Sequence, residues 1–173
     1  AGLDIADRVT TSYSYPDGAA WHYEESAMTP KKYRTWGVWR GYDRVVTTVG
    51  VASEKTVTEN RWFRGMDGDW LVFDTTTKPV KVTDSTGVEI VDAPEYEGFL
   101  RETRLLTTTG GVTDSRTIHD PVVVRTRADD GRNKATVLDT PATRTWQRML
   151  PTGGRAPPTE TPEWDPATHP PPN

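Results

Sequence analysis

Short runs of β-branched and aromatic residues, separated by turn signals, limit what this chain can fold into more than any other feature. Thr, Val, Tyr and Trp fill these runs, and these residues suit half-buried pleated surfaces. Turns rich in Gly and Asp separate the runs at short intervals, which is typical of all-β proteins. The predicted strands span residues 8–15, 20–24, 44–49, 55–62, 70–73, 80–83, 88–91, 100–109, 112–118, 122–127, 134–138 and 142–149. We therefore expect an all-β fold in which successive antiparallel hairpins form an open or curved sheet.

Four turn signals predict how these strands pair. Pro-Asp-Gly at residues 16–18 would join the first two strands into a hairpin. Turns at residues 84–87, 110–111 and 129–131 would close three later hairpins. Helix signals are few, and they predict single turns at Pro30–Tyr33 and at 94–99, where Pro stands at the first helical position.

One strand shows its two faces clearly. In the run that ends at Trp62, alternation places Thr56, Thr58, Asn60 and Trp62 on one face. Val57, Glu59, Arg61 and Phe63 then lie on the other face.

The composition predicts a narrow core and excludes several classes of function. Only 34% of the residues are apolar, so seven Trp, six Tyr and three Phe are expected to supply buried area. The net charge of −4 gives no electrostatic support for a nucleic-acid partner. The chain has no cysteine for a disulfide or a thiol nucleophile, and no apolar run approaches the roughly 18 residues of a membrane span.

The composition changes near residue 150, which predicts a two-part organisation. Residues 1–150 carry the strand pattern and form the expected hairpin segment. Residues 151–173 are dense in Pro, Gly, Thr and Ala, with one Trp and almost no aliphatic residue. Such a segment buries too little to fold alone, so we expect a Pro-rich linker or extended arm.

Two blocks of the sequence share a pattern of Tyr, Asp and Gly: Tyr-x-Tyr-Pro-Asp-Gly at 13–18 and Gly-Tyr-Asp-Arg-Val-Val-Thr at 41–47. They resemble degenerate copies of the YD repeat of rearrangement-hotspot (RHS) proteins. The blocks at residues 32–42, 61–69, 98–103 and 117–121 follow one another in an order that resembles the long RHS proteins of actinobacteria. The resemblance covers roughly residues 8–150.

The resemblance implies a structural role in a larger protein. In that family, repeated hairpins wind into a secreted or surface-exposed shell around a toxin, so the expected partner is the rest of a parent repeat protein, joined by sheet-edge pairing. The start at Ala1-Gly2-Leu3 fits the expectation of a piece of a longer chain. Asp120-Pro121 is followed by Val122 and lacks the family's self-cleavage pattern, so no autoprotease role is carried over. We expect no enzyme activity, no catalytic residue, no metal and no cofactor.

Three tryptophans support an alternative of another class. Trp21, Trp36 and Trp39 could stack against sugar rings, which would make the chain a carbohydrate-binding β-sandwich with a cell-surface glycan as partner. The competing interpretation places these tryptophans in the core, because the chain is short of Leu and Ile.

Other combinations of residues give weaker indications of a catalytic or metal-binding site. Ser115, His119 and Asp120 could be drawn as a triad, but the sequence has no nucleophile elbow. Asp67-Gly68-Asp69 resembles a fragment of a calcium loop, and turn chemistry explains it equally well. The remaining candidates are two carboxylate pairs of the kind that glycosidases use: Glu24 with Glu25, and Glu95 with Glu97.

Overall fold

The computed structural model describes residues 9–51, 54–73, 75–108, 111–129 and 134–148, and this part of the chain is all-β. Two 3₁₀ turns, η1 (Lys31–Tyr33) and η2 (Pro94–Tyr96), lie where the sequence predicts single helical turns. The strands are β1 (Thr10–Ser14), β2 (Ala19–Tyr23), β3 (Trp36–Tyr42), β4 (Arg44–Val51), β5 (Glu54–Trp62), β6 (Trp70–Val72), β7 (Thr76–Thr77), β8 (Lys81–Thr83), β9 (Glu89–Val91), β10 (Leu100–Leu106), β11 (Thr113–Asp129) and β12 (Lys134–Gln147).

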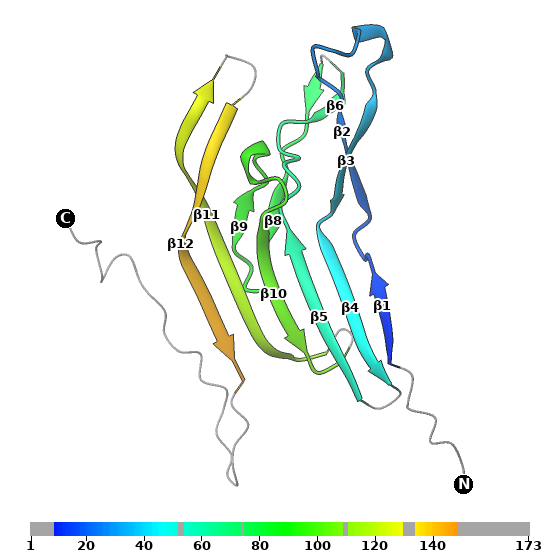
Figure 1. Cartoon of the computed structure of the whole chain (residues 1–173), viewed down its shortest axis with the longest axis vertical. Helices are drawn as coiled ribbons and strands as arrows, with labels where there is room; N and C mark the ends of the chain where they lie inside the picture. The colour runs from blue at the N-terminus through cyan, green and yellow to red at the C-terminus, as the bar shows by residue number, and fades with distance from the viewer. Residues whose placement is uncertain (1–8, 52–53, 74, 109–110, 130–133, 149–173) are drawn as a thin grey trace, which may run out of the picture.

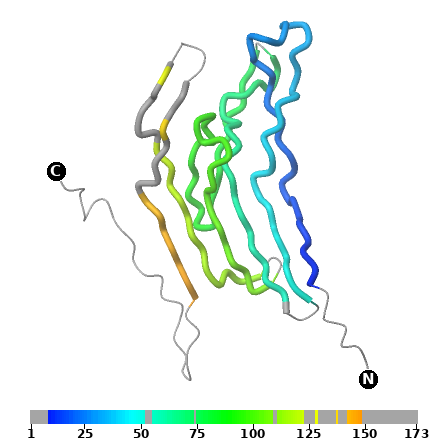
Figure 2. Tube along the Cα trace, viewed as in Figure 1, coloured from blue at the N-terminus to red at the C-terminus, as the bar shows by residue number. Residues whose placement is uncertain are grey.

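Six strands form one open antiparallel sheet, as the sequence predicts (Figure 1). Their order is β1-β4-β5-β10-β11-β12, so the sheet is laid down in the order of the chain. Figure 2 shows this directly, because the colour runs from blue at one edge of the sheet to orange at the other. The sheet does not close, and β1 and β12 are its two edge strands.

The first predicted hairpin is wrong. β1 and β2 do not pair with each other; β1 pairs with β4, and β2 pairs with β3. The two pairs are consecutive parts of one long ribbon, in which residues 15–18 interrupt a single extended run instead of reversing it. The Pro-Asp-Gly segment therefore acts as a bulge, with Gly18 at φ +76° and a weak bond from its N–H to the Tyr15 carbonyl at 3.5 Å.

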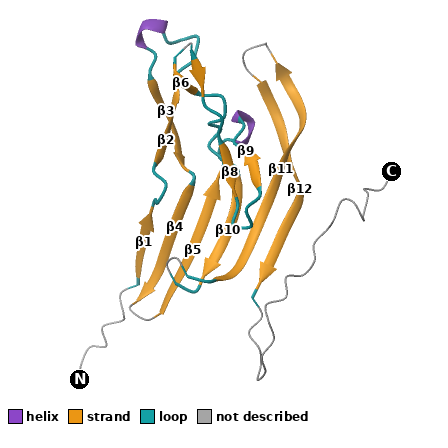
Figure 3. Ribbon diagram, turned by 180° about the vertical axis from the view of Figure 1, so that it is seen from behind, coloured by secondary structure: helices purple, strands orange, loops and turns teal. Residues whose placement is uncertain are grey.

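The last two strands make one hairpin that extends beyond the sheet. β10 pairs with β11 only as far as Ile118, while β11 and β12 stay paired to Asp129 and Lys134 (Figure 3). The sequence predicts that strands end near residues 119–121 and 139–141. In the structure, β11 and β12 continue through both segments. Pro121 lies inside β11, and the register between β11 and β12 shifts beside it. Because a bulge accommodates a residue that has no backbone N–H to pair, the strand continues past Pro121.

Two short hairpins lie outside the main sheet. β6 pairs with β7, and β8 pairs with β9 around the turn that the sequence predicts at residues 84–87. The predicted pairings of 100–109 with 112–118, and of the two strands around residues 129–131, are confirmed as β10–β11 and β11–β12.

The apolar core is small. Val46, Val57 and Leu106 form its central cluster. The alternation predicted for β5 is confirmed, because Val57, Glu59 and Phe63 are buried while Thr56 is exposed. The tryptophans of the described part do not fill the core, and Trp21, Trp36 and Trp39 keep 48%, 40% and 47% of their surface exposed. Charged side chains take part of the buried volume instead, and Arg101 and Glu102 are both fully buried.

The predicted Pro-rich arm at 151–173 lies outside the described residues. Within the described part, no helix is both long enough and apolar enough to cross a bilayer.

Candidate functional site

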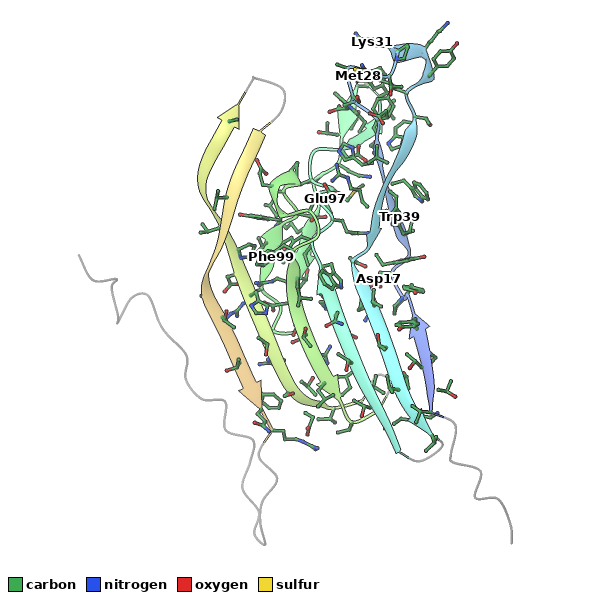
Figure 4. The ribbon with its side chains drawn as sticks, in the orientation of Figure 1. Asp17, Met28, Lys31, Trp39, Glu97 and Phe99 are labelled. Carbon is green, nitrogen blue, oxygen red and sulfur yellow. The ribbon has the colours of Figure 1, made fainter. Side chains whose placement is uncertain are left out.

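A row of aromatic rings, most of them exposed, lies along the ribbon of β2 and β3. Trp21 and Trp39 face each other across the two strands, with ring centroids 4.9 Å apart and planes at 66°. Trp39 also contacts Tyr42 edge-on at 5.4 Å, and Tyr42 stacks on Tyr15 at 4.0 Å. We call Tyr15, Trp21, Trp39 and Tyr42 the aromatic row. Figure 4 shows Trp39 projecting outward from this ribbon.

A glycine bulge brings these rings into one row. Trp39 and Tyr42 are three residues apart, so in a regular strand they would point to opposite faces. Gly41 has φ +77°, and the register between β2 and β3 shifts beside it. This conformation suits glycine, and the extra residue turns Tyr42 toward the side of Trp39.

Trp36 belongs to a second aromatic group. Its ring packs against Tyr23 at 5.1 Å, and its indole N–H donates to the Trp70 carbonyl at 2.9 Å. Tyr23 stacks on Phe73 at 4.6 Å, and Phe73 contacts Trp70. The three tryptophans predicted as one sugar platform are therefore divided, with Trp21 and Trp39 in the aromatic row and Trp36 outside it.

A buried charge cluster joins the β8–β9 turn to the main sheet. Arg101 on β10 donates to Asp84 Oδ2 at 2.6 Å, to the His119 carbonyl at 2.7 Å and to the carboxylate of Asp120. Arg144 on β12 binds the same two carboxylates, at 3.0 Å from Asp84 and 3.2 Å from Asp120. We call Asp84, Arg101, Asp120 and Arg144 the charge cluster. Arg101 and Asp84 are fully buried, and their pairing meets the condition for keeping charges in an interior, while the side chains of Arg144 and Asp120 are 25% and 29% exposed.

A bulge in β10 lets two consecutive side chains reach the same turn. The register between β10 and β5 shifts between Leu100 and Glu102. Glu102 then accepts the Ser85 backbone N–H at 2.9 Å and the Ser85 hydroxyl, next to the bond from Arg101 to Asp84. Sequence reasoning missed this cluster, because alternation gives no sign that adjacent charged residues will both be buried.

Two influences compete at Asp84. Burial by itself would raise the pKa of this carboxyl group. Hydrogen bonds from the hydroxyl and N–H of Thr86 and from the N–H of Val88, together with the charge of Arg101, outweigh burial and leave the pKa below its ordinary value. The carboxylate is therefore held in its charged form. The same pairing raises the pKa of Arg144 despite its burial.

Two other aspartates hold the loops. Asp92 is fully buried and accepts the N–H groups of Arg64, Gly65 and Met66 at 2.8, 2.8 and 3.2 Å. Asp69 accepts the Tyr23 N–H at 3.0 Å and pairs with Lys78 at 3.1 Å.

The weaker sequence candidates are engaged in similar structural contacts. Asp67 accepts the Val80 N–H at 2.8 Å, a bond between segments 13 residues apart. Glu25 accepts the indole N–H of Trp70, and Glu97 pairs with Arg40. His119 lies 3.3 Å from the Thr143 hydroxyl. No group of three or more potential metal ligands occurs among the described residues.

Comparisons with known proteins give no relative. No family model matches the chain, and no curated protein or solved structure is significantly similar to it. The resemblance to YD-repeat proteins therefore stays a prediction, and function has to be argued from the structure.

Proposed function

We propose that this chain is a non-catalytic structural segment of a larger secreted or cell-surface β-sheet assembly of the YD-repeat type. The observation that carries the proposal is the open six-stranded sheet, which follows chain order and leaves both edge strands unpaired among the described residues. A sheet with this topology can be lengthened at a free edge without rearrangement of its other strands.

The distribution of buried groups supports the same proposal. Among the described residues, the central apolar cluster has three members, and several large apolar side chains, including Val9, Tyr13 and Leu71, are more than half exposed. A self-contained domain would leave fewer large apolar side chains exposed. By the resemblance, the assembly would enclose or present a toxin.

The experiment is equilibrium unfolding of the protein in urea, followed by fluorescence and circular dichroism, with small-angle scattering for shape. We expect an elongated particle with low stability and a shallow transition, because the small core exposes little new surface on unfolding. A compact monomer that unfolds cooperatively and resists heat would overturn the proposal.

A second candidate is a carbohydrate-binding module that uses Trp21 and Trp39. Their exposure favours it, because exposed indole rings can stack on sugars. The edge-to-face geometry counts against a flat platform, so we rank it second. If it holds, a glycan shifts the Trp fluorescence, Trp39→Ala removes the shift, and Trp36→Ala retains it. The absence of a response across a broad glycan array would exclude this candidate.

A further inference from the structure

The two edges of the sheet differ in chemistry. β1 reads Thr-Thr-Ser-Tyr-Ser and carries no charge, and all five residues are exposed. Its register with β4 is unbroken from Thr10 to Ser14, so the strand is regular along its length. A regular, uncharged edge strand is a template for adding another strand, because its outward N–H and C=O groups are unpaired.

β12 has the features by which proteins protect an edge. Its sequence contains Lys134, Asp139 and Pro141. The register between β11 and β12 shifts three times. Charge, Pro and bulges each discourage edge-to-edge pairing. The β1 edge of the sheet is therefore open to pairing with another strand, and the β12 edge is protected from it.

The residues after β1 limit how far an added strand can extend. Pro16 lacks an N–H, and Asp17 binds the guanidinium of Arg44 through both carboxylate oxygens, at 2.7 and 2.9 Å. The Gly18 bulge follows. The strip available for pairing is therefore Thr10–Ser14.

We propose that the outer edge of β1 accepts an antiparallel strand, and that in the isolated protein this strand is β1 of a second copy. In an antiparallel pair centred on Ser12, Tyr13 of one copy lies opposite Thr11 of the other. An aromatic residue opposite a β-branched residue is a favourable cross-strand pair. No like charges meet across the twofold axis, because the strand has none. The inference rests on the proposed function, since it names the edge through which the segment joins another sheet.

The test is sedimentation of the intact protein over a wide concentration range. We expect the mean mass to rise from 19.3 kDa toward twice that value. Ser12→Lys should weaken dimerisation at least tenfold, because two copies of the cation meet at the centre of the pair. Thr11→Lys is a second variant at the same edge. Thr145→Lys is the matched control, since Thr145 is exposed on β12 and the change adds the same charge there.

The outcomes separate this inference from the proposed function. A protein that stays monomeric at every concentration, or a dimer broken by Thr145→Lys and not by Ser12→Lys, would overturn the inference. Either result leaves the unfolding test of the structural segment unaffected. A heat-stable, cooperatively unfolding protein that still dimerises through β1 would keep the inference and overturn the proposed function.

Discussion

The charge cluster and the aromatic row hold strands together in opposite ways. In the charge cluster, two arginines and two aspartates from separate segments are paired, and two of them, Arg101 and Asp84, have fully buried side chains. In the aromatic row, Trp21 and Trp39 join two neighbouring strands while about half of each side chain stays in solvent. A chain short of aliphatic residues thus uses paired charges in one region and exposed rings in the other.

The difference predicts how each region responds to change. A buried charge that loses its partner cannot reach water, so breaking the charge cluster affects folding as a whole. An exposed ring that loses its partner is still solvated, so breaking the aromatic row has a small, local effect.

The largest effect is expected from Arg101→Met. The change removes the fully buried cation beside Asp84 and leaves Arg144 alone to balance the carboxylates of Asp84 and Asp120. We expect a loss of about 3–5 kcal/mol in the free energy of unfolding, measured with urea. The control is Arg148→Met, which removes a half-exposed pair with Asp114 and should lose about 0–1 kcal/mol. Equal losses in the two variants would contradict the structural role of the charge cluster.

Gly65→Ala should rank second and tests the loop whose backbone N–H groups bind Asp92. Gly65 has φ +67°, and a Cβ there would lie 3.0 Å from Pro94 Cα. Backbone strain and the clash together should destabilise the protein by about 3 kcal/mol. Gly68→Ala, at φ +80° with no atom within 4 Å of an added Cβ, carries the strain alone and should lose about 1–2 kcal/mol.

Part of this fold is predictable because it depends on local sequence. The alternation that buries Val57 and Phe63, the turn at residues 84–87 and the single helical turn at Lys31 all follow from neighbouring residues. The sequence does not predict β3, because Gly37 and Gly41 lower the strand propensity of that segment. β3 is stabilised by its pairing with β2, which local sequence does not reveal.

The wrong predictions concern segments whose local sequence allows two conformations, because a contact between residues far apart in the sequence decides which of them forms. Pro-Asp-Gly at 16–18 suits a hairpin turn and also suits a bulge, and the pairing of β1 with β4 selects the bulge. The charge cluster is a stronger case. Nothing in the sequence near Arg101 shows that Asp84, Asp120 and Arg144 will surround it, because each partner lies at least 17 residues away.

Acidification provides a milder way to weaken the charge cluster. The folded-state pKa of Asp84 lies below that of the unfolded chain, which is about 3.9. Its contribution to stability is therefore fully present above the unfolded pKa, and it is lost as the pH falls through the folded pKa. We expect the free energy of unfolding to decrease below about pH 4.

Thr86→Val isolates the part of that pH dependence that belongs to Asp84. The change removes the hydroxyl that donates to Asp84 Oδ1 at 2.6 Å, so the pKa of Asp84 should move back toward its ordinary value. Urea unfolding at a series of pH values should then show a shallower decrease on acidification than in the unchanged protein. An unchanged pH profile would mean that other carboxylates account for the acid sensitivity.

The smallest effect is expected in the aromatic row, where a double-mutant cycle on Trp21 and Trp39 measures the pair directly. Each change to Ala also removes other contacts, and the cycle subtracts them, leaving the coupling between the two rings. The edge-to-face geometry at 4.9 Å predicts a coupling of about 0.5–1.5 kcal/mol. Trp36 and Trp39 form the control cycle, because Trp36 packs in the other aromatic group, and their coupling should be near zero. If the Trp21–Trp39 coupling were also near zero, the row would not stabilise the ribbon, and its exposed rings would then have to be explained by a ligand.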